Sequence, residues 1–455
     1  MSTKMDGIYQ QSLFSKSLGL SVIVSENSRY RILANTLPWI ELANTFNHYR
    51  AEKVNINIGR KLNLRLHIGA YIAQSMNGWS DRETEEMVRY HVGVRILCGL
   101  EESLETLDRT SIETFRNQIG PEGSEAINSI LILHAMGAGY TDSEICASDT
   151  TVQEAPIAYP TEVGHMQKIA EKLLSLGKKA GLKSVQSLKD LGQKAKDTFT
   201  EIRLFTRGKK EAVIEAKKKL GKKMHEIVSS MLAEVDSGLK KAGKKKKEAS
   251  QDTINLCQHM LEQIEVWMKT GFHPANKIIS LWDTNARAIA KEKTGKAVEF
   301  GRRWLITRLL GGYVIGSPCI KLGSDSDANI AEEVLIQFLN IFGESPKSFI
   351  YDRGGDGPKN HELLANLGVE DNCIFRKGSE KMSVEDSVFE MARKERALTE
   401  ASIATLKTPK YNFNKPRARS MESCVLKGHT AILGFNINNL LKDIIQTWDL
   451  VPEIT

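Results

Sequence analysis

Residues 144–149, EICASD, and residues 347–352, KSFIYD, decide the expected fold, because each is a short apolar run that ends in aspartate. We predict a strand in each, with Asp149 closing the first and Asp352 closing the second. In open α/β sheets, ligand-binding side chains gather where strands end. The two carboxylates are therefore candidates for one shared site, although each aspartate could instead cap a turn.

A third candidate carboxylate lies on a predicted helix. In residues 396–407, RALTEASIATLK, Arg396 precedes Glu400 by four positions and Lys407 follows it by seven, so the three share one helix face. Glu400 could also be an ordinary exposed residue that pairs with Arg396. Converging carboxylates repel each other unless cations bind between them, and hard oxygen ligands suit Mg²⁺ or Mn²⁺. The pattern therefore favours two-metal phosphodiester chemistry, with the basic side chains holding DNA phosphates.

Length and composition fit a globular protein of two to four domains. The chain has 455 residues, of which 41% are hydrophobic and 26% charged. It contains no apolar run long enough for a membrane helix and no apolar signal segment near the start. The six cysteines are scattered without pairing motifs, which argues against a structural zinc site and a disulfide framework. We expect a cytoplasmic protein with no membrane partner.

Positive charge is concentrated in one part of the chain. Residues 161–250 hold 23 lysines and arginines against 11 acidic residues, whereas the whole chain has a net charge of only +7. Apolar residues such as Met224, Val228 and Met231 recur at helical spacing in the same segment. The segment therefore reads as helices with a basic face, which suits nucleic acid or is simply solvated.

The expected organisation is a mixed α/β (α+β) fold with four segments. Residues 1–140 form a helical N-terminal domain for DNA binding or dimerisation, with capping boxes predicted at Ser80–Glu83 and Thr110–Glu113. The first part of a sheet core occupies 141–161, a lysine-rich helical insertion occupies 162–272, and the rest of the core occupies 273–455. Periodicity does not decide whether the first segment contains a helix-turn-helix.

Several stretches in this order resemble the DDE transposases of bacterial insertion sequences, which have an RNase-H-like catalytic core. They are WSDRETEEMVRYHVGVRILCG at 79–99, DRTSIETFRNQIG at 108–120, SDTTVQEAPIAYP at 148–160, GKAVEFG at 295–301, IYDRG at 350–354 and EASIATLK at 400–407. One branch of that family carries tyrosine, arginine, glutamate and lysine at fixed spacing. Arg396, Glu400 and Lys407 fit this spacing, but Arg393 stands at the tyrosine position, which puts a hairpin or base-flipping step in doubt.

The resemblance implies that Asp149, Asp352 and Glu400 are the catalytic, metal-binding triad, with two Mg²⁺ ions that Mn²⁺ can replace. It implies cleavage at terminal inverted repeats and strand transfer into target DNA by a nucleoid-associated homodimer. The insertion either holds DNA or stabilises the dimer. The expected DNA-binding side chains are Arg396, Lys407, Arg353, Lys217, Lys218, Lys222, Lys244 and Lys245.

Other functions and other acids remain open. The chain could be a catalytically inactive, domesticated descendant that binds DNA, or a nuclease that cuts without strand transfer. Asp356 and Glu154 are weaker candidates for the site, whereas Glu395 points well away from Glu400 around the helix. Three histidines have no partner spacing that suggests metal ligation, and we assign them no role: His165, His361 and His429.

Overall fold

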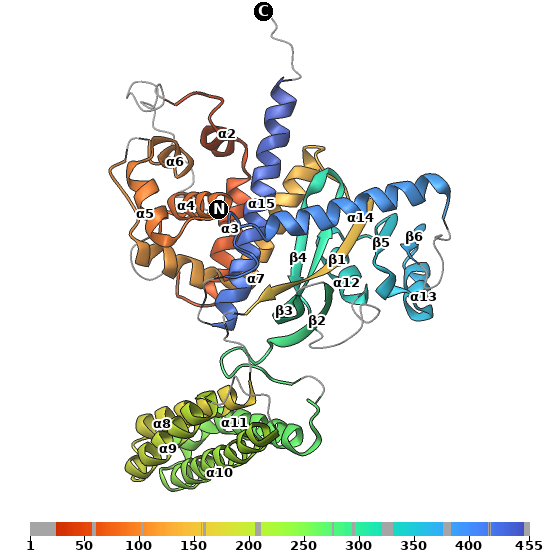
Figure 1. Ribbon diagram of the computed structural model, residues 1–455. Coiled ribbons are helices and arrows are strands. Elements are labelled where there is room, and N and C mark those ends of the chain that lie inside the picture. The colour runs from red at the N-terminus through yellow and green to blue at the C-terminus, as the bar shows by residue number, and fades with distance from the viewer. Residues whose placement is uncertain are drawn as a thin grey trace, which may run out of the picture. The chain divides into compact units, whose positions relative to one another are not determined.

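The computed structural model describes most of the chain in two compact units (Figure 1). The described residues are 24–56, 61–101, 103–155, 157, 161–204, 211–274, 277–293, 296–320, 331–375, 384–416, 418 and 420–449. Unit 1 comprises those within 1–154, 302–321 and 325–455, and unit 2 those within 155–301. The mixed α+β class predicted from the sequence is confirmed, and no helix in the described part of the chain is long and apolar enough to cross a membrane.

Within the described residues, the N-terminal part of unit 1 contains helices and no strand before residue 145. Its helices pack together with the C-terminal helix α15 around one apolar core, and α7 is kinked at Gly120 before Pro121. The helices are α2 (Arg29–Thr36), α3 (Trp39–Ala51), α4 (Leu64–Asn77), α5 (Asp81–Tyr90), α6 (Val92–Leu97), α7 (Arg109–Gly137) and α15 (Met421–Asp449).

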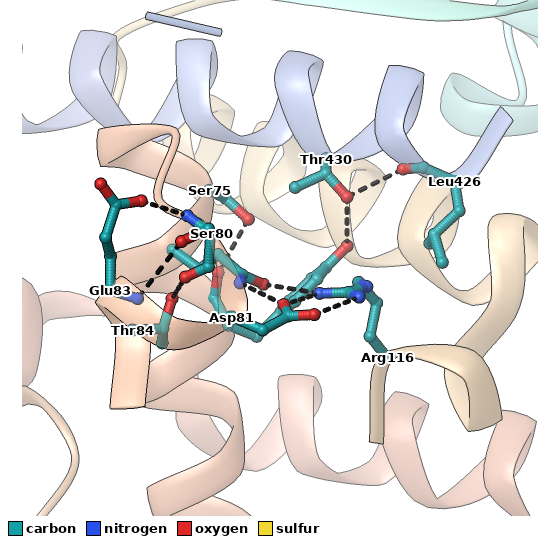
Figure 2. Close-up of polar contacts among 10 residues, drawn as sticks. Ser75, Ser80, Asp81, Glu83, Thr84, Arg116, Leu426 and Thr430 are labelled. Carbon is teal, nitrogen blue, oxygen red and sulfur yellow. Dashed lines mark hydrogen bonds and ion pairs between the residues drawn. The ribbon is translucent and has the colours of Figure 1, made fainter. Parts of the chain in front are cut away.

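Local capping explains where two of these helices begin. Ser80 and Glu83 form the predicted capping box at the start of α5, drawn in Figure 2. The box predicted at Thr110 is wrong, because Asp108 precedes it and caps α7 by accepting from the backbone of Thr110 and Ser111. A carboxylate is an effective N-cap acceptor, so α7 begins two positions earlier than the expected cap implies.

A polar cluster joins these helices. Arg116 on α7 forms an ion pair with Asp81 on α5, as Figure 2 shows, and also donates to Gln74 on α4. Burial alone would raise the pKa of Asp81, but the hydrogen bonds and charge of Arg116 lower it. Because both partners are satisfied, the pair ties α5 and α7 together without leaving a buried charge unpaired.

The sheet of unit 1 has the strand order β4-β3-β1-β5-β6. Its strands β1 and β5 pair in parallel, as do β5 and β6, whereas β3 and β4 are antiparallel. The bounds are β1 (Ile145–Glu154), β3 (Lys296–Arg308), β4 (Val314–Pro318), β5 (Ser348–Tyr351) and β6 (Asp371–Ile374). The short helices η1 (Leu310–Gly312) and η3 (Arg353–Gly355) follow β3 and β5.

Both faces of this sheet are covered, so β5 is buried along its whole length and β1 is buried from Cys146 to Ser148. Cys146 and Phe349 point to the core shared with α12 (Ala331–Phe342), whereas their neighbours Ala147 and Ile350 point to α14 (Asp386–Leu406). The remaining helix, α13 (Pro358–Asn366), lies between β5 and β6 in the chain. The alternation follows from the period of two in a strand, so every second residue faces α14.

Unit 2 is a helical bundle followed by a β-hairpin. The bundle has its own core, in which α10 buries Met224, Val228, Met231 and further residues at helical spacing, as the sequence indicates. Strand β2 (Arg287–Lys293) pairs antiparallel with β3 from Lys296 to Gly301. The bundle helices are α8 (Glu162–Ala180), α9 (Val185–Leu204), α10 (Glu211–Lys241) and α11 (Lys244–Thr270).

Helices α4 and α15 cross with their backbones almost in contact. A Cβ atom at Gly434 would lie 2.0 Å from the carbonyl oxygen of Ser75, while Asn438 donates to the carbonyl of Met76 at 3.0 Å. Only glycine permits this approach, because any side chain would force the two helices apart.

We predict that Gly434→Ala destabilises unit 1 by about 1–3 kcal/mol, because the added methyl overpacks the crossing. Urea unfolding followed by tryptophan fluorescence measures the change. Gly137→Ala is the control, since a Cβ there meets nothing within 4 Å. Equal urea midpoints for the two variants would contradict the close approach of α4 and α15 at Gly434.

The buried His429 makes the stability of the fold depend on pH. Its ring packs edge-on against Trp304 at 5.0 Å, and burial lowers its pKa from the ordinary 6.5 to about 3. The native ring is therefore neutral, and the approach of Glu125 at 4.0 Å is not an ion pair. Between pH 6.5 and 3 only the unfolded chain takes up this proton, so the histidine's contribution falls as the pH falls.

We predict that His429 accounts for about 2 kcal/mol of the stability lost between pH 7.5 and pH 5. The measurement compares urea midpoints of wild type and His429→Gln at both pH values. The variant is less stable at pH 7.5 but loses less on acidification. Identical pH slopes for the two proteins would show that His429 does not titrate on unfolding.

Candidate functional site

The pairing of β1 with β5 places Asp149 and Asp352 at equivalent positions. The paired register runs as far as Ala147 opposite Ile350, and each aspartate follows two residues later on its own strand. Because alternate residues share a face, both aspartates lie on the side of the sheet that faces α14. The structure thus brings together two residues that are far apart in the sequence.

One detail of the sequence prediction is wrong. Asp149 does not close its strand, because β1 continues through Glu154. The β-branched residues Thr150, Thr151 and Val152 favour extended backbone and carry the strand on. Asp352 does follow the end of β5, where it accepts a hydrogen bond of 2.6 Å from the backbone of Arg353.

Helix α14 lies close to the sheet because the residues between them are small. Ala147, Cys373 and Ala392 form a compact cluster with Ile350 beneath the helix. Thr399 is buried there and donates to the carbonyl of Ala147 at 3.4 Å. Glu400 is the next residue on α14, and its side chain is 61% exposed at the edge of this contact. Close packing at Thr399 therefore holds the adjacent segment of α14 against β1.

Arg396 joins two of the three predicted triad members. Its guanidinium donates to Asp352 at 2.6 Å and approaches the Glu400 carboxylate at 3.7 Å. It also lies over the ring of Phe375, 5.4 Å from the centroid. Asp352 and Glu400 thus share one cation, and three different chain segments surround it.

A buried ion pair that the sequence reasoning missed anchors the same helix. Glu395 on α14 pairs with Arg308 at the end of β3, with side-chain exposures of 8% and 11%. Glu395 points away from Glu400, as its helical offset predicts. Glu395 follows Ala392 by three positions and precedes Thr399 by four, so the three residues share one helix face. This spacing could have indicated from the sequence that Glu395 faces the sheet.

The competing acids have other partners. Asp356 pairs with His361 at 2.8 Å, and that histidine also contacts Asn372 at 2.7 Å. Glu154 is five residues beyond Asp149 along β1, and its carboxylate lies 3.3 Å from the ammonium group of Lys415. The structure therefore engages both acids in contacts that do not include the predicted triad.

The other histidines without an assigned role also have structural contacts. His165 is buried, with its Nε2 3.0 Å from the carbonyl oxygen of Ile279, and His429 packs on Trp304. In His165, burial lowers the pKa, so its ring favours the neutral form. These contacts account for both residues as parts of the packed interior.

The predicted DNA-binding residues fall into two groups. In unit 1, Arg353 is exposed in η3 beside Asp352, and Lys407 is half-buried at the end of α14. On the bundle of unit 2, Lys217 is half-buried and Lys218, Lys222, Lys244 and Lys245 are exposed. The bundle core keeps these lysines at the surface of α10 and α11, where anions can reach them.

The carboxylates have the chemistry of a magnesium site, since Mg²⁺ and Mn²⁺ prefer hard oxygen ligands. Within the described residues, however, no group of three histidine, cysteine, aspartate or glutamate side chains lies close enough to hold a metal ion. Arg396 lies between Asp352 and Glu400 instead.

Comparison with known proteins adds a family to this geometry. The family described as Transposase domain (DUF772) matches residues 20–118, the region that contains α2 to α6 and the start of α7. The uncharacterized protein ORF8 in the nfe locus of Rhizobium meliloti is 26% identical over 182 residues, which is 39% of this chain and 86% of that protein. No solved structure gives a significant match. The family match supports, for residues 20–118, the resemblance to transposases seen in the sequence.

Proposed function

We propose that the chain is a DDE transposase with an RNase-H-like core, which cleaves DNA at the terminal inverted repeats of its element and joins the ends to target DNA. Asp149, Asp352 and Glu400 are its catalytic residues. The protein acts on double-stranded DNA as a homodimer and associates with the nucleoid in the cytoplasm. The transposase-domain match supports the general class, and the site geometry supports the reaction.

One observation carries this proposal. Two aspartates occupy equivalent positions on adjacent parallel strands, and a helix with a glutamate packs across the same face. Side chains on strands and a packed helix are held more rigidly than side chains on loops. Three carboxylates carried on one face of a sheet would suit metal-dependent phosphoryl transfer if their oxygens converge on a metal.

In this proposal the three carboxylates would hold two Mg²⁺ ions, which Mn²⁺ can replace. When bound, such ions activate an attacking water or hydroxyl and stabilise the leaving oxygen. The chain's own residues do the rest: the three carboxylates hold the ions, while Arg396, Arg353 and Lys407 position DNA phosphates. Arginine suits this role because its planar guanidinium donates two parallel hydrogen bonds to a phosphate.

The basic bundle of unit 2 binds DNA through its exposed lysines. Its exposed lysines on α10 and α11 stand on an independently packed core, so they form a fixed basic surface. Such a surface binds phosphates of any sequence. Recognition of the repeat ends then falls to other residues, with the N-terminal helical domain as our candidate.

We predict that Asp149→Asn, Asp352→Asn and Glu400→Gln each abolish strand cleavage while leaving DNA binding intact, because each removes a negative metal ligand. A supercoiled plasmid carrying both flanks of the gene serves as substrate, with and without Mg²⁺. Glu390→Gln is the matched control, since it neutralises an exposed glutamate on the same helix.

Two results would count against this assignment. Cleavage by Glu400→Gln would remove the helix glutamate from the triad. Binding of the flanking DNA by wild type without any cutting would favour the alternative, a catalytically inactive, domesticated DNA-binding protein. Cutting without joining would instead indicate a nuclease.

We predict that Lys244→Gln/Lys245→Gln weakens DNA binding and lowers the salt slope of log K by roughly 0.9 for each phosphate that the variant no longer neutralises. Fluorescence anisotropy with a labelled duplex at several NaCl concentrations measures both quantities. The control, Lys347→Gln/Lys442→Gln, removes the same charge from exposed positions in unit 1. Equal weakening in both double variants would indicate that only net charge matters.

A further inference from the structure

Arg396 lies where a cation is needed. Asp352 and Glu400 come from different segments, and the guanidinium contacts the first at 2.6 Å and the second at 3.7 Å. The Asp352 carboxylate is about one-third exposed, and so is Arg396. Two carboxylates around one positive group are stable together, whereas without it they would repel each other.

One oxygen of Asp352 is already engaged, because Oδ1 accepts from both Arg396 and the backbone of Arg353. The Asp352 oxygen that accepts from Arg396 is one that a metal ligand would present to the ion. Mg²⁺ binds oxygen at roughly 2.0–2.1 Å and demands near-octahedral geometry, which leaves no room for a guanidinium between the ligands. A divalent ion and Arg396 therefore compete, both sterically and by charge.

We propose that Arg396 is an exchangeable internal cation, which holds Asp352 and Glu400 together in the metal-free protein and leaves when metal and DNA phosphate arrive. This inference rests on the proposed metal site. It makes Arg396 a positioning residue with two successive partners, first the carboxylates and then a phosphate. Metal binding to the free protein is weakened by this competition, and a phosphate that draws Arg396 away strengthens it.

The surrounding contacts allow the side chain to move while the helix stays. The buried pair of Glu395 with Arg308 and the contact of Thr399 with Ala147 hold α14 on the sheet. Arg396 and Glu400 lie at the edge of this packing, with exposures of 33% and 61%. Exchange thus requires only new rotamers of two partly exposed side chains.

Mn²⁺ binding to the purified full-length protein, followed by the electron paramagnetic resonance signal of free Mn²⁺, tests the exchange without DNA. We expect Arg396→Gln to bind Mn²⁺ about tenfold more tightly than wild type, because a repelling charge and a competitor are both removed. Arg396→Lys keeps the charge and stays within about threefold of wild type. Circular dichroism of each variant verifies the fold.

Two further variants separate this inference from the metal site itself. Lys394→Gln removes an exposed charge from the opposite side of α14 and should bind Mn²⁺ as wild type does. Asp352→Asn should lose the site. Unchanged or weaker binding by Arg396→Gln, or equal tightening by Arg396→Lys, overturns the exchange. If no protein, including Arg396→Gln, shows binding that depends on Asp352, the proposed metal site fails and the exchange fails with it.

Discussion

The parallel pairing of β1 with β5 is the constraint on which the candidate site depends. It aligns Ala147 with Ile350, and two residues further along each strand stand Asp149 and Asp352. A shift of one residue would turn one aspartate to the opposite face of the sheet. Burial of both faces opposes that shift, because it would exchange the residues packed under α14 for those packed against α12.

Charge balance is the second determinant of the site. Arg396 lies between Asp352 and Glu400, while Glu395 is neutralised by Arg308 in a nearly buried pair. Removing one partner of a buried pair leaves a costly unpaired charge, so Arg308 and Glu395 fix the helix. The more exposed Arg396 contacts are weaker, since solvent screens them. Two adjacent residues of α14 thus differ in how firmly they are held: Glu395 is in a buried ion pair, whereas Arg396 is in partly exposed contacts, which we propose can exchange.

Each of the two units buries apolar side chains in a hydrophobic core of its own. Unit 1 joins its N-terminal helices to α15 by backbone contact at Gly434 and by one shared core. The bundle in unit 2 buries residues such as Met224 and Val228 within its own core. A segment that closes its own core can be inserted into a chain at little cost to the host core. The exposed lysines of the bundle therefore lie outside its apolar core.

Local pattern and periodicity were enough to predict the mixed α+β class, the helices before residue 140 and within 162–272, and the capping box at Ser80. The same reasoning ended β1 too early, at Asp149, because the β-branched residues that follow continue the strand. It also placed the N-cap of α7 at Thr110, although Asp108 is the residue that caps the helix. Only the tertiary structure decided that Asp149 and Asp352 are in register, that Glu395 pairs with Arg308, and that Arg396 bridges two carboxylates. Strand register and contacts between distant segments arise from packing across the whole sheet, which no local stretch of sequence encodes.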